Sequence, residues 1–107
     1  MRITKGPLPK TAPRRAAVLS RDQALSLALC ALSYVVEEDR RIEKFLQLTG
    51  VDPSDLPALA PEPSFLLAVL DHLAGDEELL LSFAGEQRVR PETIELARRA
   101  LGGGEAG

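Results

Sequence analysis

The chain has 107 residues, no tryptophan, and only one tyrosine and three phenylalanines. A chain of this length forms one domain with a modest core, and a composition rich in Leu and Ala and poor in β-branched and aromatic residues favours helix over strand. The single cysteine, Cys30, excludes an intramolecular disulfide, so the fold does not depend on oxidation and we predict a cytoplasmic protein.

The charge is distributed unevenly along the chain. The formal net charge is −3, but residues 1–15 carry five basic side chains and no acidic one. Residues 16–107 therefore hold the other 8 of the 13 basic groups against all 16 acidic groups, a balance of −8. A basic tail on an acidic body is able to attract anionic partners or to lie against its own body.

The first 19 residues are predicted to form a flexible, locally extended arm. Pro7, Pro9 and Pro13 stand among the basic residues, so the backbone dihedral φ is fixed at several points and little apolar surface is available for burial.

The pair Arg14-Arg15 before the apolar run 24–36 looks superficially like a twin-arginine signal peptide. Ser26 and Ser33 interrupt that run, no small-x-small cleavage site follows it, and acidic residues end it. The run is also too short to span a bilayer, so we interpret it as a buried helix and expect no membrane association.

The first predicted helix starts at Ser20, which forms a capping-box pattern with Gln23. Five apolar side chains repeat on one helical face and are expected to point inward: Leu25, Ala28, Leu29, Leu32 and Val36. Leu27, Ala31 and Val35 widen that face, which leaves only a narrow polar stripe formed by Ser26, Cys30, Ser33 and Glu37. A helix so nearly apolar all round is expected to be the central one.

Five further helices follow from their start and stop signals. A helix over 39–49, with Ile42, Phe45, Leu46 and Thr49 inward, ends at Gly50, and a short one after Asp52-Pro53 ends before Pro61. A fourth runs from about Ser64 to Gly75, a fifth is capped by Asp76 and ends within 85–89, and a sixth opens at Pro91 and stops at Gly102. Residues 20–101 are thus predicted to be an all-α, compact bundle of about six short helices, followed by a disordered tail over 102–107.

Two segments of the sequence resemble a known family. They are FLQLTGVDP at residues 45–53 and DEELLLSFA at 76–84, with the helical stretch 63–73 between them. Together they resemble the small, mostly alphaproteobacterial proteins catalogued as domain of unknown function 3572, over about residues 22–101. The resemblance implies a bacterial, compact helical protein and supplies no activity, ligand or catalytic residue. His72 departs from it, since an apolar or aromatic residue is expected there.

Few residues offer reactive chemistry. Nucleophilic catalysis needs a nucleophile with an oriented base, and Cys30 with His72 is the pair to consider; Asp71, His72 and Asp76 are the metal-ligand candidates. The run of three acids at 76–78 is explained by the dipole of the helix that starts there. No glycine-rich phosphate loop is present. We therefore predict no catalytic residue, no metal ligand, no cofactor, and a protein that is not an enzyme.

Three function classes are compared, of which an enzyme is the least favoured. Residues 79–101 are predicted to form two helices joined by a short turn, with Arg88 and Arg90 in the turn and Arg98 and Arg99 on the second helix. This pattern is typical of a nucleic-acid-associated regulator, which would use either this helix pair or the basic arm. Glu92 and Glu95 lie on the part of the second helix that would approach the nucleic acid, where their negative charge would repel the phosphates.

The favoured hypothesis is a non-catalytic protein-interaction domain. Its many leucines, including Leu67 and Leu81 beside the predicted inward faces, exceed what one small core can hide, and exposed apolar surface marks interaction sites. The expected partner is a protein, either a second copy or another chain, with nucleic acid bound only weakly.

Overall fold

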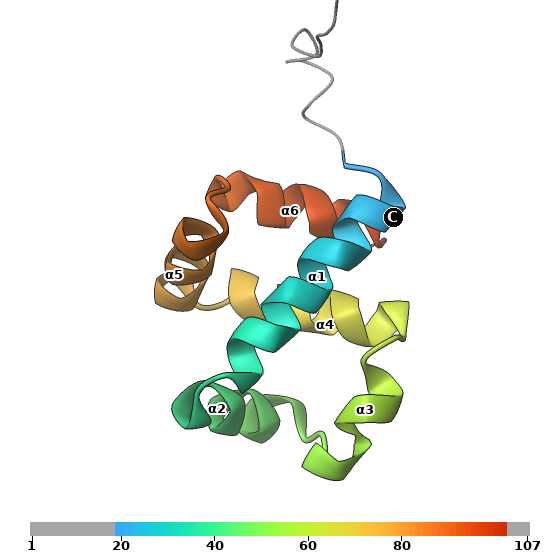
Figure 1. Cartoon of the computed structure of the whole chain (residues 1–107), viewed down its shortest axis with the longest axis vertical. Helices are drawn as coiled ribbons and strands as arrows, with labels where there is room; N and C mark the ends of the chain where they lie inside the picture. Colours follow the sequence, from blue (N-terminus) through green and yellow to red (C-terminus); the bar gives the residue numbers. More distant parts are fainter. Residues whose placement is uncertain (1–18, 103–107) are drawn as a thin grey trace, which may run out of the picture.

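The computed structural model describes residues 19–102, so the predicted arm (1–19) and tail (102–107) lie outside the described residues except for Leu19, which packs partly buried against the core, and Gly102. The elements are α1 (Arg21–Val36), α2 (Asp39–Thr49), the 3₁₀ helix η2 (Pro53–Asp55), α3 (Leu56–Leu59), α4 (Pro63–Ala74), α5 (Glu77–Gln87) and α6 (Pro91–Ala100). Residues 19–102 contain no strand, and the prediction of an all-α bundle of about six short helices is confirmed (Figure 1).

Helix α1 is the central element, as predicted. It packs against α2, α4 and α6, and Figure 1 shows it running diagonally from α6 to α2 across α4. Its buried face consists largely of small side chains, because Ala24, Ala28 and Ala31 are all fully buried. Small residues at these positions allow the backbone of α1 to approach α4 and α6 closely.

The prediction that Leu29 and Val36 point inward is wrong. Each side chain is 43% exposed. The face that meets α4 and α6 is centred on the three buried alanines and Val35, so residues on the flank of the apolar arc remain at the surface. An apolar arc that covers most of a helix does not itself indicate which part faces the core.

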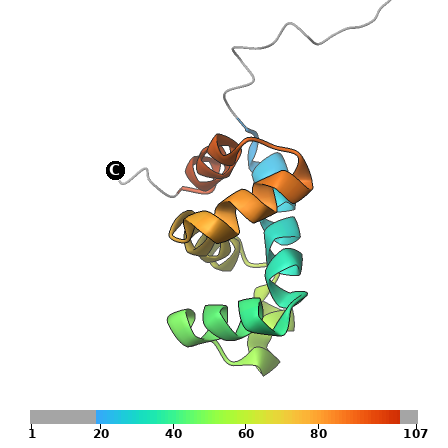
Figure 2. The ribbon, with the colours of Figure 1, turned by 90° about the vertical axis from the view of Figure 1, so that its left-hand side faces the viewer.

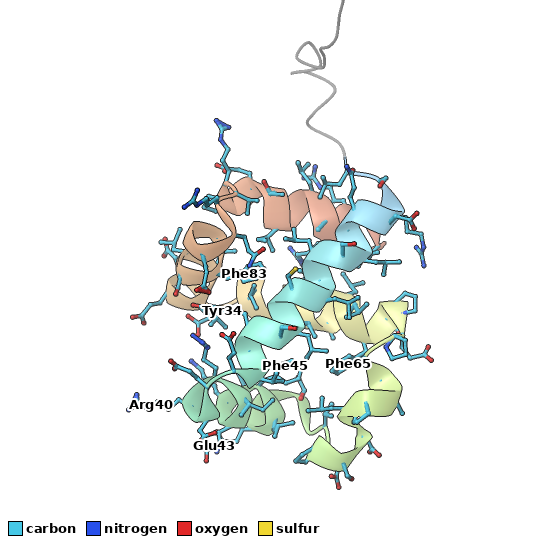
Figure 3. The ribbon with its side chains drawn as sticks, in the orientation of Figure 1. Tyr34, Arg40, Glu43, Phe45, Phe65 and Phe83 are labelled. Carbon is cyan, nitrogen blue, oxygen red and sulfur yellow. The ribbon has the colours of Figure 1, made fainter. Side chains whose placement is uncertain are left out.

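Helix α2 is held to the rest of the domain by Phe45, which is fully buried. Its ring meets Phe65 edge-on at 5.9 Å between centroids, and His72 at 5.0 Å. Both Phe65 and His72 belong to α4, so one side chain joins the two helices (Figure 3). Aromatic pairs in this geometry add to the free energy gained by burial alone. Thr49, predicted to point inward, is instead exposed, and its hydroxyl donates to the Phe45 carbonyl oxygen at 2.8 Å.

A second aromatic pair attaches α5 to α1. The rings of Tyr34 on α1 and Phe83 on α5 lie 5.3 Å apart at an angle of 58°, and the Tyr34 hydroxyl is hydrogen-bonded to that of Ser82. In Figure 2, α5 (orange) crosses in front of α1 (blue to cyan). Phe83 is fully buried, so this contact is part of the main core.

The predicted capping signals are confirmed at most helix ends. Ser20 and Gln23 form the reciprocal capping box of α1, with distances of 2.9 and 3.0 Å. Asp76 accepts from the backbone N–H of Leu79 at the start of α5, and Pro91 opens α6. Helix α5 ends in a way the pattern did not indicate, since the left-handed residue after it is Arg88, with φ of 59°, and not a glycine.

Gly50 ends α2 in the left-handed conformation, with φ of 75°. An added Cβ would meet nothing within 4 Å, so the only penalty of a side chain is conformational. We expect Gly50→Ala to lower the free energy of unfolding by about 1 kcal/mol.

Gly85 provides the matched control for this substitution. It lies inside α5 and also has open space around a built Cβ, but φ is not positive there. Gly85→Ala should therefore stabilise the domain, by about 0.5–1 kcal/mol. Chemical denaturation of both variants checks the pair, and a Gly50→Ala protein as stable as the parent would remove this explanation of the Thr49-Gly50 motif.

Candidate functional site

The two residues considered for nucleophilic catalysis line different hollows. Cys30 is exposed on α1 and lines a hollow with Ser33, Tyr34 and Glu86. His72, on α4, lines a separate cavity with side chains from α2 and α5. The geometry therefore does not bring this thiol and this imidazole together as nucleophile and base.

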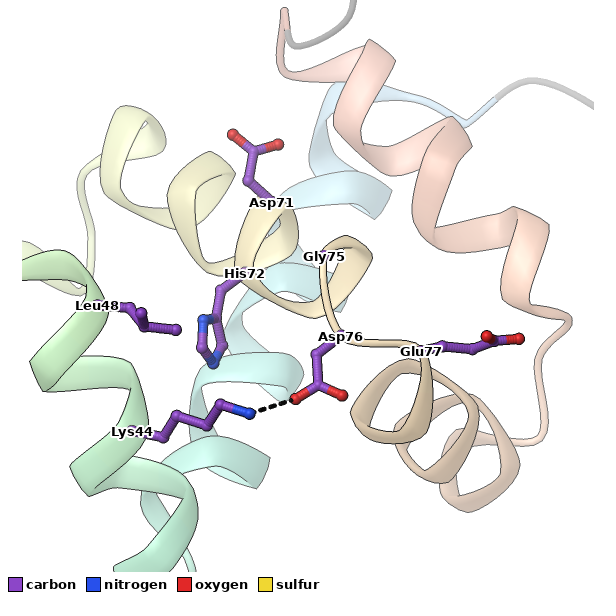
Figure 4. Close-up of a pocket in the computed structure, with 7 residues that line it drawn as sticks. All are labelled: Lys44, Leu48, Asp71, His72, Gly75, Asp76 and Glu77. Atoms are coloured by element: carbon purple, nitrogen blue, oxygen red, sulfur yellow. Dashed lines mark hydrogen bonds and ion pairs between the residues drawn. The ribbon is translucent and has the colours of Figure 1, made fainter.

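One hollow, which we call the His72 cavity, has a volume of about 460 Å³ and is lined by Lys44, Leu48, Asp71, His72, Gly75, Asp76 and Glu77. It lies where the end of α4 and the start of α5 face α2. Figure 4 shows the His72 ring between Leu48 and the ion pair of Lys44 with Asp76. Leu48 is 67% exposed at its rim.

Lys44 and Asp76 form the electrostatic link across the His72 cavity, with 3.1 Å between Nζ and Oδ2. The pKa of Asp76 is held below its ordinary value, first by the hydrogen bond from the Leu79 backbone N–H and then by Lys44. Asp76 thus caps α5 and contacts α2 at the same time. Its carboxylate is already occupied by structural partners.

His72 is the one titratable side chain here whose surroundings disfavour charge. Burial lowers its pKa, the nearby carboxylate of Asp76 opposes this, and Lys44 adds to it. Its Nε2 atom is buried and has no hydrogen-bond partner among the described residues.

This environment predicts a pH dependence of stability. The pKa of His72 in the folded protein lies below its unfolded value of about 6.5, so the unfolded state binds the proton at a higher pH than the folded state does. The contribution of neutral His72 to the free energy of unfolding is therefore fully present above about pH 6.5 and is lost as the pH falls below that value. We expect His72→Phe, which keeps an edge-on ring against Phe45, to reduce the loss of unfolding free energy between about pH 7.5 and pH 5.5.

Denaturation of both proteins at the two pH values measures this difference, in which the contributions of the other titrating groups cancel. A parent and a His72→Phe variant with identical pH profiles would contradict the proposed burial effect.

The candidate metal ligands do not converge. Asp71 points away from His72 (Figure 4), and its Oδ1 accepts from Nε of Arg98 on α6 at 2.6 Å. Asp76 is engaged by Lys44. Among residues 19–102, no group of three or more His, Cys, Asp or Glu side chains has an arrangement able to hold a metal ion.

The two arginines on helix α6 form ion pairs within the bundle. Arg98 donates to both Asp71 and Glu95, each at 2.6 Å. Asp71 is the first cause of a raised pKa at Arg98. Arg99 lies 3.7 Å from Glu95. These cations are paired with carboxylates within the bundle, which leaves Arg88 and Arg90 as the exposed basic residues of the turn.

The surface also carries apolar side chains that the core does not cover. The largest exposures are those of Leu29, Val36, Leu48 and Leu81, with Leu81 at 50%; Leu67, the other leucine expected in excess of the core, is partly buried. Leu29 and Val36 stand seven residues apart on α1 and share one face with the partly buried Leu25. We call these three residues the apolar edge of α1. Sequence periodicity placed all three in the core, so this surface was missed.

Fold and surface together define a small all-α domain, and none of the helices within residues 19–102 has the length and apolar content needed to cross a bilayer. The model of one protein family, described as "Protein of unknown function (DUF3572)", matches residues 21–104, and the chain belongs to this family. Neither a curated protein nor a solved structure matches the chain.

Proposed function

We propose that this domain is a non-catalytic protein-interaction module and that the apolar edge of α1 is its docking surface. The observation that carries the proposal is the 43% exposure of both Leu29 and Val36 on one face of the central helix. Apolar side chains that lie exposed together on one helix face mark a surface that a partner covers.

The size of the edge favours a transient interface. A stable complex buries about 800 Å² on each partner, which a few side chains cannot supply, so polar surface around the edge must complete the contact. This suits reversible binding to another protein better than a permanent dimer, whose interfaces are larger and more apolar.

The other functions weighed for this chain find less support. Residues 19–102 carry 8 basic and 15 acidic side chains, so the body would repel phosphates wherever it came close. For catalysis, Cys30 and His72 lie in different hollows and the carboxylates of Asp71 and Asp76 are each held by a cation.

Site-specific photo-crosslinking in the native host tests the proposal. A photoreactive residue at position 29 should yield a discrete crosslinked protein, whereas the same residue at position 47, exposed on α2, should not. Absence of any product from position 29, or the same products from both positions, would contradict docking at the apolar edge.

A further inference from the structure

A groove runs along the surface between α1 and α5, on the other flank of α1 from the apolar edge. It consists of two hollows that share Tyr34: one of about 160 Å³ between α1 and the end of α5, and one of about 270 Å³ between the start of α5 and residues 38–41 at the start of α2. We call it the α1–α5 groove. Figure 3 shows Tyr34 between the two helices, beside Phe83, and the first hollow is the one lined by Cys30.

The groove is lined by more acidic than basic side chains. Glu37 and Glu86 line its first hollow, in which no basic side chain takes part. The second hollow is lined by Glu38, Asp76 and Glu78 together with Arg40 and Arg41.

Internal pairing satisfies only some of these carboxylates. The Arg41 guanidinium lies 3.8 Å from the centroid of the Tyr34 ring and 3.7 and 3.9 Å from Glu37 and Glu38. Glu78 and Glu86 form no ion pair with any other residue of 19–102. The groove therefore offers the unpaired carboxylates of Glu78 and Glu86 to a basic ligand, while Arg41 already covers the Tyr34 ring.

We propose that the α1–α5 groove binds the basic segment 1–18 of this same chain. Charge complementarity is the first argument, since that segment carries five basic side chains and no acid. Its position in the chain is the second, because Leu19, where the described structure starts, stands at the beginning of α1 and the groove follows α1 from Cys30 onward.

The lengths of helix and segment agree with this placement. At 1.5 Å per residue, Cys30 lies about 16 Å and Glu37 about 27 Å along α1 from Leu19. An extended chain covers about 3.3 Å per residue, so Arg14 reaches the level of Cys30 and Lys10, about 30 Å from Leu19, reaches that of Glu37. Pro7, Pro9 and Pro13 favour extended backbone in this segment. A strand antiparallel to α1 thus brings cations to both hollows.

The binding gives the basic segment a role that requires no nucleic acid. It neutralises part of the acidic body and covers the hollow beside Cys30. The contact is electrostatic and exposed, so salt weakens it strongly.

Paramagnetic relaxation in the full-length protein tests the proposal. A nitroxide is attached at position 11 of a protein that carries Thr11→Cys and Cys30→Ser, and the amide signals of Glu37, Glu78 and Glu86 are followed. At about 20 mM NaCl these signals should lose most of their intensity, and at about 500 mM they should recover because charges are screened. A label introduced by Ala106→Cys is the control for non-specific broadening.

Charge reversal in the groove supplies the second arm of the test. Glu78→Lys with Glu86→Lys should restore the signals at low salt, whereas Glu62→Lys with Glu92→Lys, the same change of charge on exposed acids elsewhere, should leave the broadening in place. Groove signals that never broaden, or that broaden equally in both double variants, would overturn the proposal. So would a short DNA duplex that binds the labelled segment at about 150 mM NaCl when no groove broadening is seen without it.

Discussion

Phe45→Ala is expected to lower the free energy of unfolding by about 3–5 kcal/mol, the largest single effect anticipated for this domain. The ring is fully buried and contacts both Phe65 and His72, so truncation opens a cavity between α2 and α4. Small domains have about 5–15 kcal/mol of total stability, so this loss is a large share of it and the variant should melt well below the parent.

Leu48→Ala is the matched control, because Leu48 lies three residues further along α2 and is 67% exposed. Its effect should stay within about 0.5 kcal/mol. Urea denaturation followed by circular dichroism compares the two variants. Similar losses from both would show that α2 is not anchored through Phe45.

Ala28→Leu is expected to destabilise the domain by about 1–3 kcal/mol although it increases apolar surface. Ala28 is fully buried in the face of α1 that packs on α4 and α6, and the extra carbons of leucine would force those helices apart. Ser26→Leu is the control, because it adds a leucine at an exposed position of the same helix. It should change the free energy of unfolding by no more than about 0.5 kcal/mol. An Ala28→Leu protein that melts at the parent temperature would contradict close packing at the alanine face.

Local signals in the sequence predicted the helices well. The capping box of Ser20, the left-handed Gly50, the cap at Asp76 and the proline at the start of α6 each depend on a few neighbouring residues, and all four are confirmed. The end of α5 could be placed only within 85–89, because Arg88 adopts the left-handed conformation that usually indicates a glycine.

Features that depend on contacts distant in sequence were not predictable. Lys44 and Asp76 are 32 residues apart, and the pairing of Phe45 with His72 joins two helices whose relative rotation no pattern reveals. The same reason explains the error at Leu29 and Val36. Periodicity indicates an apolar arc, but the neighbours of α1 decide which part of that arc is covered.

Docking of a partner protein at the apolar edge of α1 is tested most directly by an affinity measurement. The dissociation constant of the protein crosslinked at position 29 is measured for two variants of equal charge, Leu29→Lys with Val36→Lys, and Gln47→Lys with Ala74→Lys, which change exposed positions on α2 and α4. We predict at least about tenfold weaker binding for the first variant, equivalent to about 1.4 kcal/mol, and little change for the second. Equal affinities of the two variants, both folded like the parent, would contradict docking at this edge.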